Sequence, residues 1–249
     1  MTSVESASPN HTRPIVLGIT TAGRVEAAVD NVRAASDEAT AGASSGKFAA
    51  VASDKPALAS LLDCVTEVLA RAEIALSDVD ALAVCIGPGS FTGLRIGVAF
   101  AKSLAQARAL PCIGVSSYDV AEAGSRALYP RASIVEGKRG YYYARLRNSP
   151  GAEPILVRGE PGEIQAAVEQ IASASGRPVA VHGACEAVTS SQSALYAARA
   201  SSRGPGEFAL SVVRLGLARL REGADTDWRR IVIDYGQRPN AVINWEGRG

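Results

Sequence analysis

A glycine-rich turn between two apolar segments carries the residues whose types and spacing could do chemistry. Residues 87–93 read G-P-G-S-F-T-G. Backbone N–H groups at the start of a helix attract anions, so phosphate binding is the first function to weigh. The spacing fits neither common phosphate motif, because a P-loop needs a lysine after its last glycine and the dinucleotide fingerprint needs G-x-G-x-x-G. An anion- or nucleotide-proximal turn and a tight structural bend therefore both stay open. The candidate residues are Gly87, Gly89, Ser90, Thr92 and Gly93.

The segments on either side of the turn predict a buried strand and a close-packed helix. Residues 81–86 form an apolar run without a polar side chain, which is typical of a strand buried on both faces. A helix is predicted over residues 90–107, and small residues recur in it every four positions, which places them in one row. Because glycine costs roughly 1 kcal/mol relative to alanine inside a helix, the row indicates a close neighbour, either a partner helix or the chain's own sheet. The row consists of Gly93, Gly97, Ala101 and Ala105.

The sequence offers little support for a nucleophile or a metal. A hydrolase would recruit Ser90 with His182 and an aspartate such as Asp119, but Ser90 lies in no G-x-S-x-G elbow, and helix capping explains it. The chain has two histidines and four cysteines that are far apart in the sequence. This pattern favours buried thiols over a zinc site or a disulfide framework. We therefore predict no catalytic residue and no metal in this chain.

Composition narrows the class of protein without identifying it. The formal net charge is +1, which gives no global attraction to nucleic acid or to a membrane. No apolar run approaches the ~20 residues of a membrane-spanning helix, and no signal peptide is recognisable. We predict a cytoplasmic protein without a membrane partner.

The signature around the turn resembles that of a known family. Residues 87–97, G-P-G-S-F-T-G-L-R-I-G, with A-K-S-L-A soon after, resemble the TsaB (YeaZ) family of bacterial tRNA threonylcarbamoyladenosine biosynthesis proteins. The similarity extends through residues 76–84 and 111–117, with weaker echoes at 136–144 and 235–239. It implies an α/β fold of the actin/sugar-kinase/Hsp70 (ASKHA) superfamily. Two subdomains with a ribonuclease H-like core would each carry a mixed sheet flanked by helices.

The order of predicted elements agrees with that fold. Three strands joined by hairpins precede strands joined through helices, which is typical of a mixed sheet covered by helices. A leader at 1–13, an N-terminal subdomain at 14–120 and a C-terminal subdomain at 121–249 are predicted. The early elements are strands at 15–19, 25–32, 47–52 and 112–116 and helices at 56–72 and 118–128. In the second half they are strands at 133–135, 141–147, 153–157 and 178–181 and helices at 161–174 and 208–221.

The resemblance also implies a function and partners. The chain would be the noncatalytic scaffold or activating subunit of the complex that transfers threonylcarbamoyl from threonylcarbamoyl-AMP to N6 of the adenosine beside the tRNA anticodon. A TsaD-like paralogue would be the catalytic partner, a TsaE-like ATPase would complete the machinery, and the chain alone could form a homodimer. ATP and metal are expected on the partner subunits, with no cofactor bound by this chain alone. A small-molecule kinase or ATPase of the same superfamily is the alternative, and a peptidase is a weaker one.

Two positions depart from the family, and they weaken the case for independent nucleotide chemistry. Thr20 follows the first strand, where related chains carry an aspartate, and Glu136 also replaces an aspartate. Basic residues interleaved with tyrosines form a candidate RNA patch of Lys138, Arg139 and Arg145. The predicted partner interface uses the two helices beside the central strand. Its residues are Leu58, Leu61, Leu62, Val65, Leu94, Gly97, Val98 and Ala101.

Overall fold

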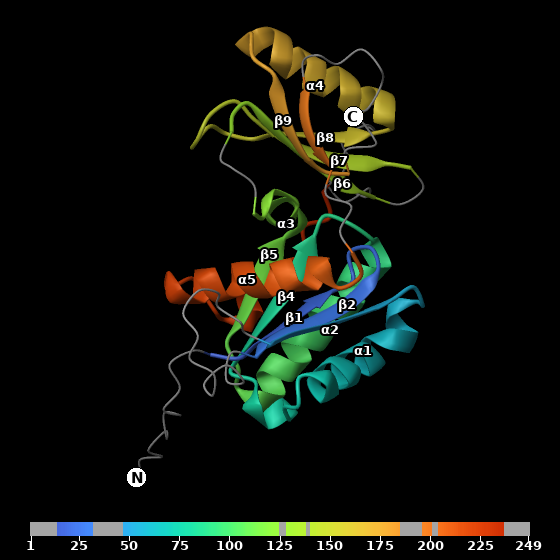
Figure 1. The fold of residues 1–249 in the computed structure, drawn as a ribbon, viewed down its shortest axis with the longest axis vertical. Coiled ribbons are helices and arrows are strands. Elements are labelled where there is room, and N and C mark those ends of the chain that lie inside the picture. The colour runs from blue at the N-terminus through green and yellow to red at the C-terminus, as the bar shows by residue number, and fades with distance from the viewer. Residues whose placement is uncertain are drawn as a thin grey trace, which may run out of the picture.

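Figure 1 shows the fold in a computed structural model of the chain. The structure describes residues 14–31, 47–124, 128–137, 140–184, 196–200 and 204–236. The predicted leader lies outside these ranges, as do Lys138 and Arg139 of the candidate RNA patch.

The first sheet has five strands in the order β3-β2-β1-β4-β5. Strand β1 pairs antiparallel with β2, and β2 pairs antiparallel with β3, whereas β1, β4 and β5 run parallel. The mixed sheet predicted from the order of elements is therefore confirmed. The bounds are β1 Val16–Thr20, β2 Val25–Asn31, β3 Lys47–Ser53, β4 Ala81–Gly87 and β5 Cys112–Ser116.

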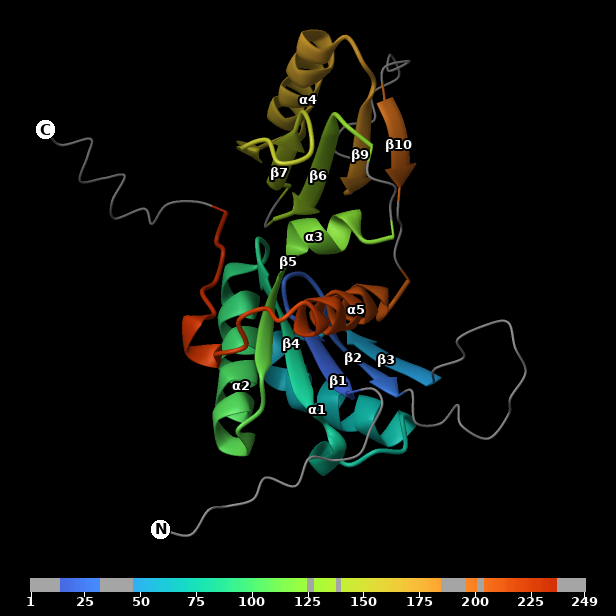
Figure 2. The same cartoon turned by 90° about the vertical axis from the view of Figure 1, so that its left-hand side faces the viewer.

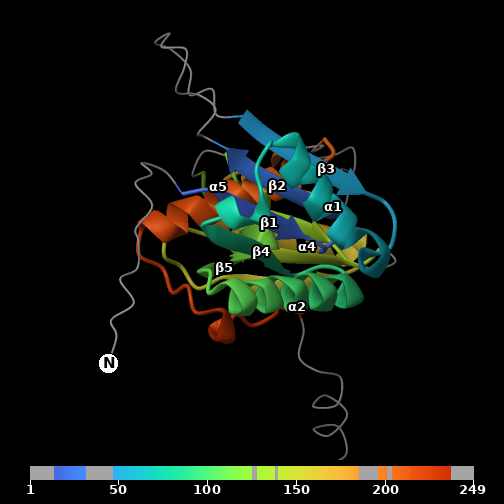
Figure 3. The same cartoon turned by 90° about the horizontal axis from the view of Figure 1, so that it is seen from below.

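Helices cover both faces of this sheet (Figures 1 and 3). Helices α1 (Ala57–Arg71) and α2 (Phe91–Arg108) lie on one face, and α5 (Glu207–Arg221) lies on the other. The alternation within β1 shows why both layers form. Leu17 and Ile19 pack with α1 and α2, whereas Val16 packs with α5. A strand buried on both faces is expected to be apolar, as β4 is and as β1 is up to its last residue, Thr20.

The second sheet also has five strands, in the order β10-β9-β6-β7-β8. Helix α4 (Pro161–Ser175) packs on one face, and the short helix α3 (Ser117–Glu122) contacts β6 and β9 and stands between the two sheets (Figure 2). The strand bounds are β6 Arg131–Glu136, β7 Tyr142–Arg147, β8 Ile155–Gly159, β9 Val179–Gly183 and β10 Tyr196–Ala200. The 3-10 helices are η2 (Leu76–Asp78) and η4 (Trp228–Arg230).

Local predictions differ from the structure at a few places. The helix predicted at 118–128 ends at Glu122, because Ala123 is extended and Gly124 has a positive φ of 75°. Strand β8 begins two residues later than predicted, and β10 was not predicted. Helix α5 covers the first sheet although it lies far along the chain, so the segment 121–249 contributes to both sheets. The predicted domain ranges themselves stay a prediction.

The small-residue row of α2 meets this chain's own backbone. A Cβ atom built on Gly93 would overlap the carbonyl oxygen of Thr21, and one on Gly97 would overlap Thr21 Oγ1. Ala101 and Ala105 are fully buried in the same row. The row therefore lets α2 lie close to the end of β1.

We expect Gly97→Ala to lower the free energy of unfolding by about 1–3 kcal/mol, because the added methyl group has no room beside Thr21. Gly162→Ala in α4 is the matched control. Its Cβ would meet nothing within 4 Å, so the same change should be neutral or stabilising by up to about 1 kcal/mol. Chemical denaturation measures both changes. Equal effects at the two positions would contradict the close approach.

Candidate functional site

The glycine turn is bound into the fold on both sides. Gly87 has a φ of 104°, and a Cβ there would overlap the carbonyl oxygen of Asp234. Ser90 caps α2, because its Oγ accepts a hydrogen bond from the Gly93 N–H at 3.3 Å. The Ser90 N–H donates to the Ala22 carbonyl at 2.5 Å. The predicted cap is therefore present, and the hydroxyl oxygen and the backbone N–H of Ser90 both form hydrogen bonds within the chain.

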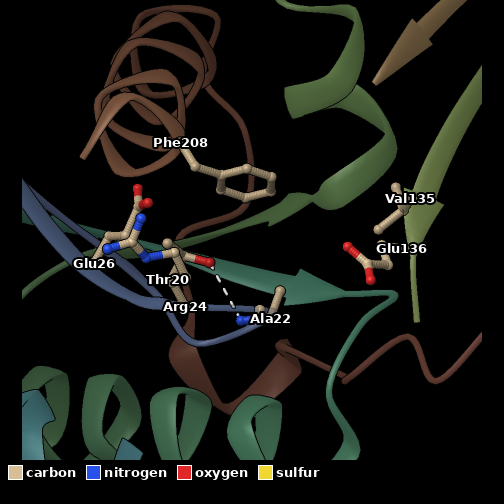
Figure 4. A pocket seen from close by; sticks show the side chains of 8 residues that line it. Thr20, Ala22, Arg24, Glu26, Val135, Glu136 and Phe208 are labelled. Carbon is tan, nitrogen blue, oxygen red and sulfur yellow. Dashed lines mark hydrogen bonds between the residues drawn. The ribbon is translucent and has the colours of Figure 1, made fainter. Parts of the chain in front are cut away.

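A pocket of about 220 Å³ opens beside this turn, between the two sheets (Figure 4). The β1–β2 connection forms one wall, the end of β6 faces it, and the first turn of α5 contributes the Phe208 ring. Thr20 and Glu136, the two positions that depart from the family, both line it. The lining residues are Thr20, Ala22, Gly23, Arg24, Glu26, Val135, Glu136 and Phe208.

A buried carboxylate lies against the N-terminus of α5, where backbone N–H groups would otherwise attract an anion. Glu26 is 6% exposed, and its Oε2 accepts a hydrogen bond from the Ala209 N–H at 3.0 Å, in the first turn of α5. Burial raises the pKa of Glu26 above its ordinary value, although N–H groups of Ala209, Gly206 and Phe208 act to lower it. The nearby Arg24 forms a salt bridge with Asp54, and its Nε lies 2.7 Å from Asp54 Oδ1. The amides of α5 thus already hold a carboxylate, and Glu136 adds a second acidic group to the lining.

The pocket residues fit neither a nucleotide phosphate nor a metal. A phosphate would lie near two acidic side chains, and the arginine that lines the pocket is already paired. Thr20 Oγ1 accepts from the Ala22 N–H at 3.4 Å and offers no carboxylate. Within the described ranges, no group of three or more His, Cys, Asp or Glu side chains could hold a metal ion.

Glu26→Gln should stabilise the protein relative to wild type as pH rises. Because the folded-state pKa of Glu26 lies above its ordinary value of 4.5, the folded state holds its proton to higher pH than the unfolded state does. The contribution of Glu26 is thus fully present below pH 4.5 and is lost as pH rises through the folded pKa. Glutamine keeps the acceptor without the charge.

Denaturation midpoints at pH 5 and pH 8 test this expectation. The variant should gain stability over wild type between the two values, while Glu153→Gln at an exposed position should not. A constant difference between Glu26→Gln and wild type would contradict it.

A network of ion pairs joins α3 to the second sheet and to α5. Glu122 accepts from Arg131 at 2.7 Å and from Arg145 at 2.9 Å, and it also contacts the Ser133 hydroxyl. Asp119 on the same helix bonds Arg145 at 2.6 Å. Arg219 of α5 continues the network, with Nη2 2.5 Å from Asp119 and Nη1 2.6 Å from the Gly114 carbonyl of β5.

The pKa values of this network follow from its contacts. Burial acts to raise the pKa of Glu122, but hydrogen bonds from Ser133, Arg145 and Arg131 together hold it below its ordinary value. The sequence analysis did not single out Glu122. The sequence does hold a signal for such a partner. Arg145 and Arg147 are two residues apart in one strand, so both side chains lie on the same face of the sheet, where buried cations need acidic partners.

Removing the Glu122 charge should destabilise the fold strongly. We expect Glu122→Gln to cost about 3 kcal/mol at pH 7, because Arg131, Arg145 and the more distant Arg147, 3.8 Å away, lose a partly buried partner. Since the pKa of Glu122 is lowered on folding, its contribution is present above pH 4.5 and is lost as pH falls below that value. The difference in unfolding free energy between wild type and variant should therefore shrink in acid. Glu67→Gln, which breaks an exposed pair with Arg71, should cost at most about 1 kcal/mol.

Of the three residues in the candidate RNA patch, the structure describes Arg145. Arg145 is 11% exposed, and it bonds Asp119 and Glu122 and stacks 5.0 Å over the Tyr118 ring. It is therefore an internal cation of the network. Lys138 and Arg139 lie outside the described residues.

The predicted interface residues fall into two groups. Leu58 and Leu62 are 86% and 65% exposed on α1, and they lie one helical turn apart. The others are buried within this chain, where they join α1 and α2 to the first sheet. These are Leu61, Val65, Leu94, Gly97, Val98 and Ala101. Whether the outer face of α1 and α2 binds a partner stays a prediction.

Comparisons with known proteins agree with the signature. The family model for TsaD, tRNA N6-adenosine threonylcarbamoyltransferase, matches residues 51–149. The chain is 47% identical over 57 residues to the tRNA threonylcarbamoyladenosine biosynthesis protein TsaB of Escherichia coli, covering 23% of this chain and 25% of that protein. It is 39% identical over 93 residues to TsaB of Bacillus subtilis, covering 36% of this chain and 37% of the relative. The matches thus span about a quarter to a third of these relatives.

A solved structure extends the likeness to nearly the whole chain. YeaZ from Pseudomonas aeruginosa superposes with a TM-score of 0.57 at 20% identity, covering 89% of this chain and 99% of that one. With two mixed sheets flanked by helices, the protein has the YeaZ/TsaD-like, ASKHA-type fold. In sequence, the chain is thus similar to TsaB proteins over part of its length and to the TsaD family over residues 51–149.

Proposed function

We propose that this chain acts in the biosynthesis of threonylcarbamoyladenosine in tRNA, as a noncatalytic subunit that binds a TsaD-like catalytic paralogue. In this proposal the assembled complex transfers threonylcarbamoyl from threonylcarbamoyl-AMP to N6 of the adenosine beside the anticodon. A TsaE-like ATPase would complete the machinery, with ATP and metal on the partner subunits. The names of the TsaB relatives support the pathway.

One observation carries the role of the partner. The segment that matches the TsaD family, residues 51–149, contains α1, the glycine turn and α2. Two chains that share these elements can pair like with like about a pseudo-twofold axis, as the identical subunits of a homodimer do about a true one. The exposed Leu58 and Leu62 on α1 give this layer an apolar outer surface that water does not favour.

The described residues give no support to independent catalysis. Ser90 is bonded within the glycine turn, and Asp119 binds two arginines. His182 is buried in β9, in the other sheet. The positions of Ser90, Asp119 and His182 therefore give no support to the hypothesis of a peptidase, and the pocket residues give none to that of a kinase. None of the helices in the described ranges is both long and apolar enough to cross a bilayer.

Charge insertion on α1 tests the proposed interface. We expect Leu62→Glu to weaken binding to the TsaD-like paralogue at least tenfold, because a carboxylate would be buried in an apolar contact. Leu156→Glu on β8 is a matched control, since Leu156 is 62% exposed and Leu62 is 65% exposed. Titration calorimetry with the full chain measures both affinities, and melting curves check folding.

The contrary result is equally clear. If Leu62→Glu binds with wild-type affinity while Leu156→Glu fails to bind, the interface lies on the second sheet. Glutamate at Leu61 or Val98 would not be informative, because both residues are 3% exposed and belong to the core.

A further inference from the structure

The side of α2 that faces the C-terminal segment carries stacked rings and cations. Phe91, in the first turn, is 48% exposed. The Arg95 guanidinium lies 4.1 Å from the centre of the Phe91 ring. The Tyr235 ring packs against the Phe91 ring at a tilt of 37°, with the two ring centroids 4.9 Å apart. The Tyr235 hydroxyl accepts a hydrogen bond from Arg95 Nε at 3.1 Å, which fixes the guanidinium in place.

The C-terminal segment forms one border of this surface. The Cys112 N–H donates to the Thr226 carbonyl at 3.0 Å, and the Asp234 N–H donates to the Ile86 carbonyl at 2.8 Å. Residues 226–234 therefore follow the edge of the first sheet from the start of β5 to the end of β4, and they run beside α2 (Figure 2). The Asp234 contact places the next residue, Tyr235, beside Phe91.

The charge of α2 has one sign. The charged residues of the helix are Arg95, Lys102 and Arg108, and it has no acidic residue. Phe91, Arg95 and Lys102 are spaced by four and seven residues, so they share one side of the helix. Neither Arg95 nor Lys102 has a carboxylate partner in the described part of the chain, whereas the exposed Arg229 and Arg230 pair with Asp227 and Asp225.

We infer that Phe91, Arg95, Lys102 and Tyr235, here called the α2 strip, form a contact for a single-stranded segment of RNA. Exposed aromatic and guanidinium planes stack on bases, and unpaired cations bind phosphates without regard to sequence. An anionic strand is favoured over an ordinary protein surface because no acidic group of α2 repels it. The inference rests on the proposed function, in which the substrate is a tRNA.

The α2 strip adjoins the face proposed for the catalytic partner. Its neighbours Thr92, Ala99 and Ser103 are exposed on the solvent side of α2. These short side chains leave the cations accessible. An RNA bound to the partner could therefore continue onto this chain without crossing an acidic surface of α2.

The test uses the full chain in complex with its TsaD-like paralogue and a fluorescently labelled, unmodified anticodon stem-loop RNA. Anisotropy titrations give the Kd at several salt concentrations. We expect Phe91→Ala to weaken binding about tenfold, through loss of one stacked base. The double variant Arg95→Ala, Lys102→Ala should lower the slope of log Kd against log salt by about 1. Arg221→Ala, on α5 across the sheet, is the control and should change neither.

Assembly without RNA is measured in parallel by titration calorimetry. Weaker RNA binding with unchanged assembly supports the inference. Unchanged RNA binding by both variants overturns it, and so does a loss that is confined to assembly, since the strip would then contact protein. If wild type itself fails to assemble, the proposed function fails. The same titrations on the chain alone then decide the RNA inference separately.

Discussion

Two carboxylates on one short helix hold the halves of this molecule together. Asp119 and Glu122 lie one turn apart on α3, and they collect arginines from β6, β7 and α5. Without them, Arg131 and Arg145 would be like charges on adjacent strands of a partly buried surface. The two sheets otherwise have separate cores. Charge pairing at α3 therefore contributes to their relative placement, beside the buried Val120 and Ala121 of the same helix.

That placement sets the shape of the pocket between the sheets. Thr20 reaches it from the first sheet and Glu136 from the second, so their separation follows the junction at α3. Glu26 removes the chemistry that a helix N-terminus would otherwise offer, by filling it with a side chain of the same molecule.

The sequence was sufficient to predict the architecture, but it did not show which apolar and charged residues would be exposed on the surface. The glycine turn, the Ser90 cap and the mixed first sheet were predictable, because turn chemistry and apolar runs are local signals. An apolar stripe on a helix, in contrast, does not show whether it packs against the same chain or against a partner. Leu61 and Val98 are buried against the chain's own sheet, whereas Leu58 is exposed. Likewise, the alternation in β7 places Arg145 on one face without showing that α3 covers it. The Glu26 contact joins residues 183 positions apart, which no local pattern reports.

The position of α5 in the chain has a consequence for synthesis. Val16, Ala28 and Ala83 form an apolar face of the first sheet, and Val212, Val213 and their neighbours on α5 form most of its cover, beside Val120 of α3. Chains emerge from the ribosome in sequence order, at about 5–20 residues per second. Every strand of this sheet is thus made long before its cover. For several seconds the nascent chain therefore exposes this apolar face of the sheet. We expect chaperones that bind apolar segments near the ribosomal exit to bind it during that time.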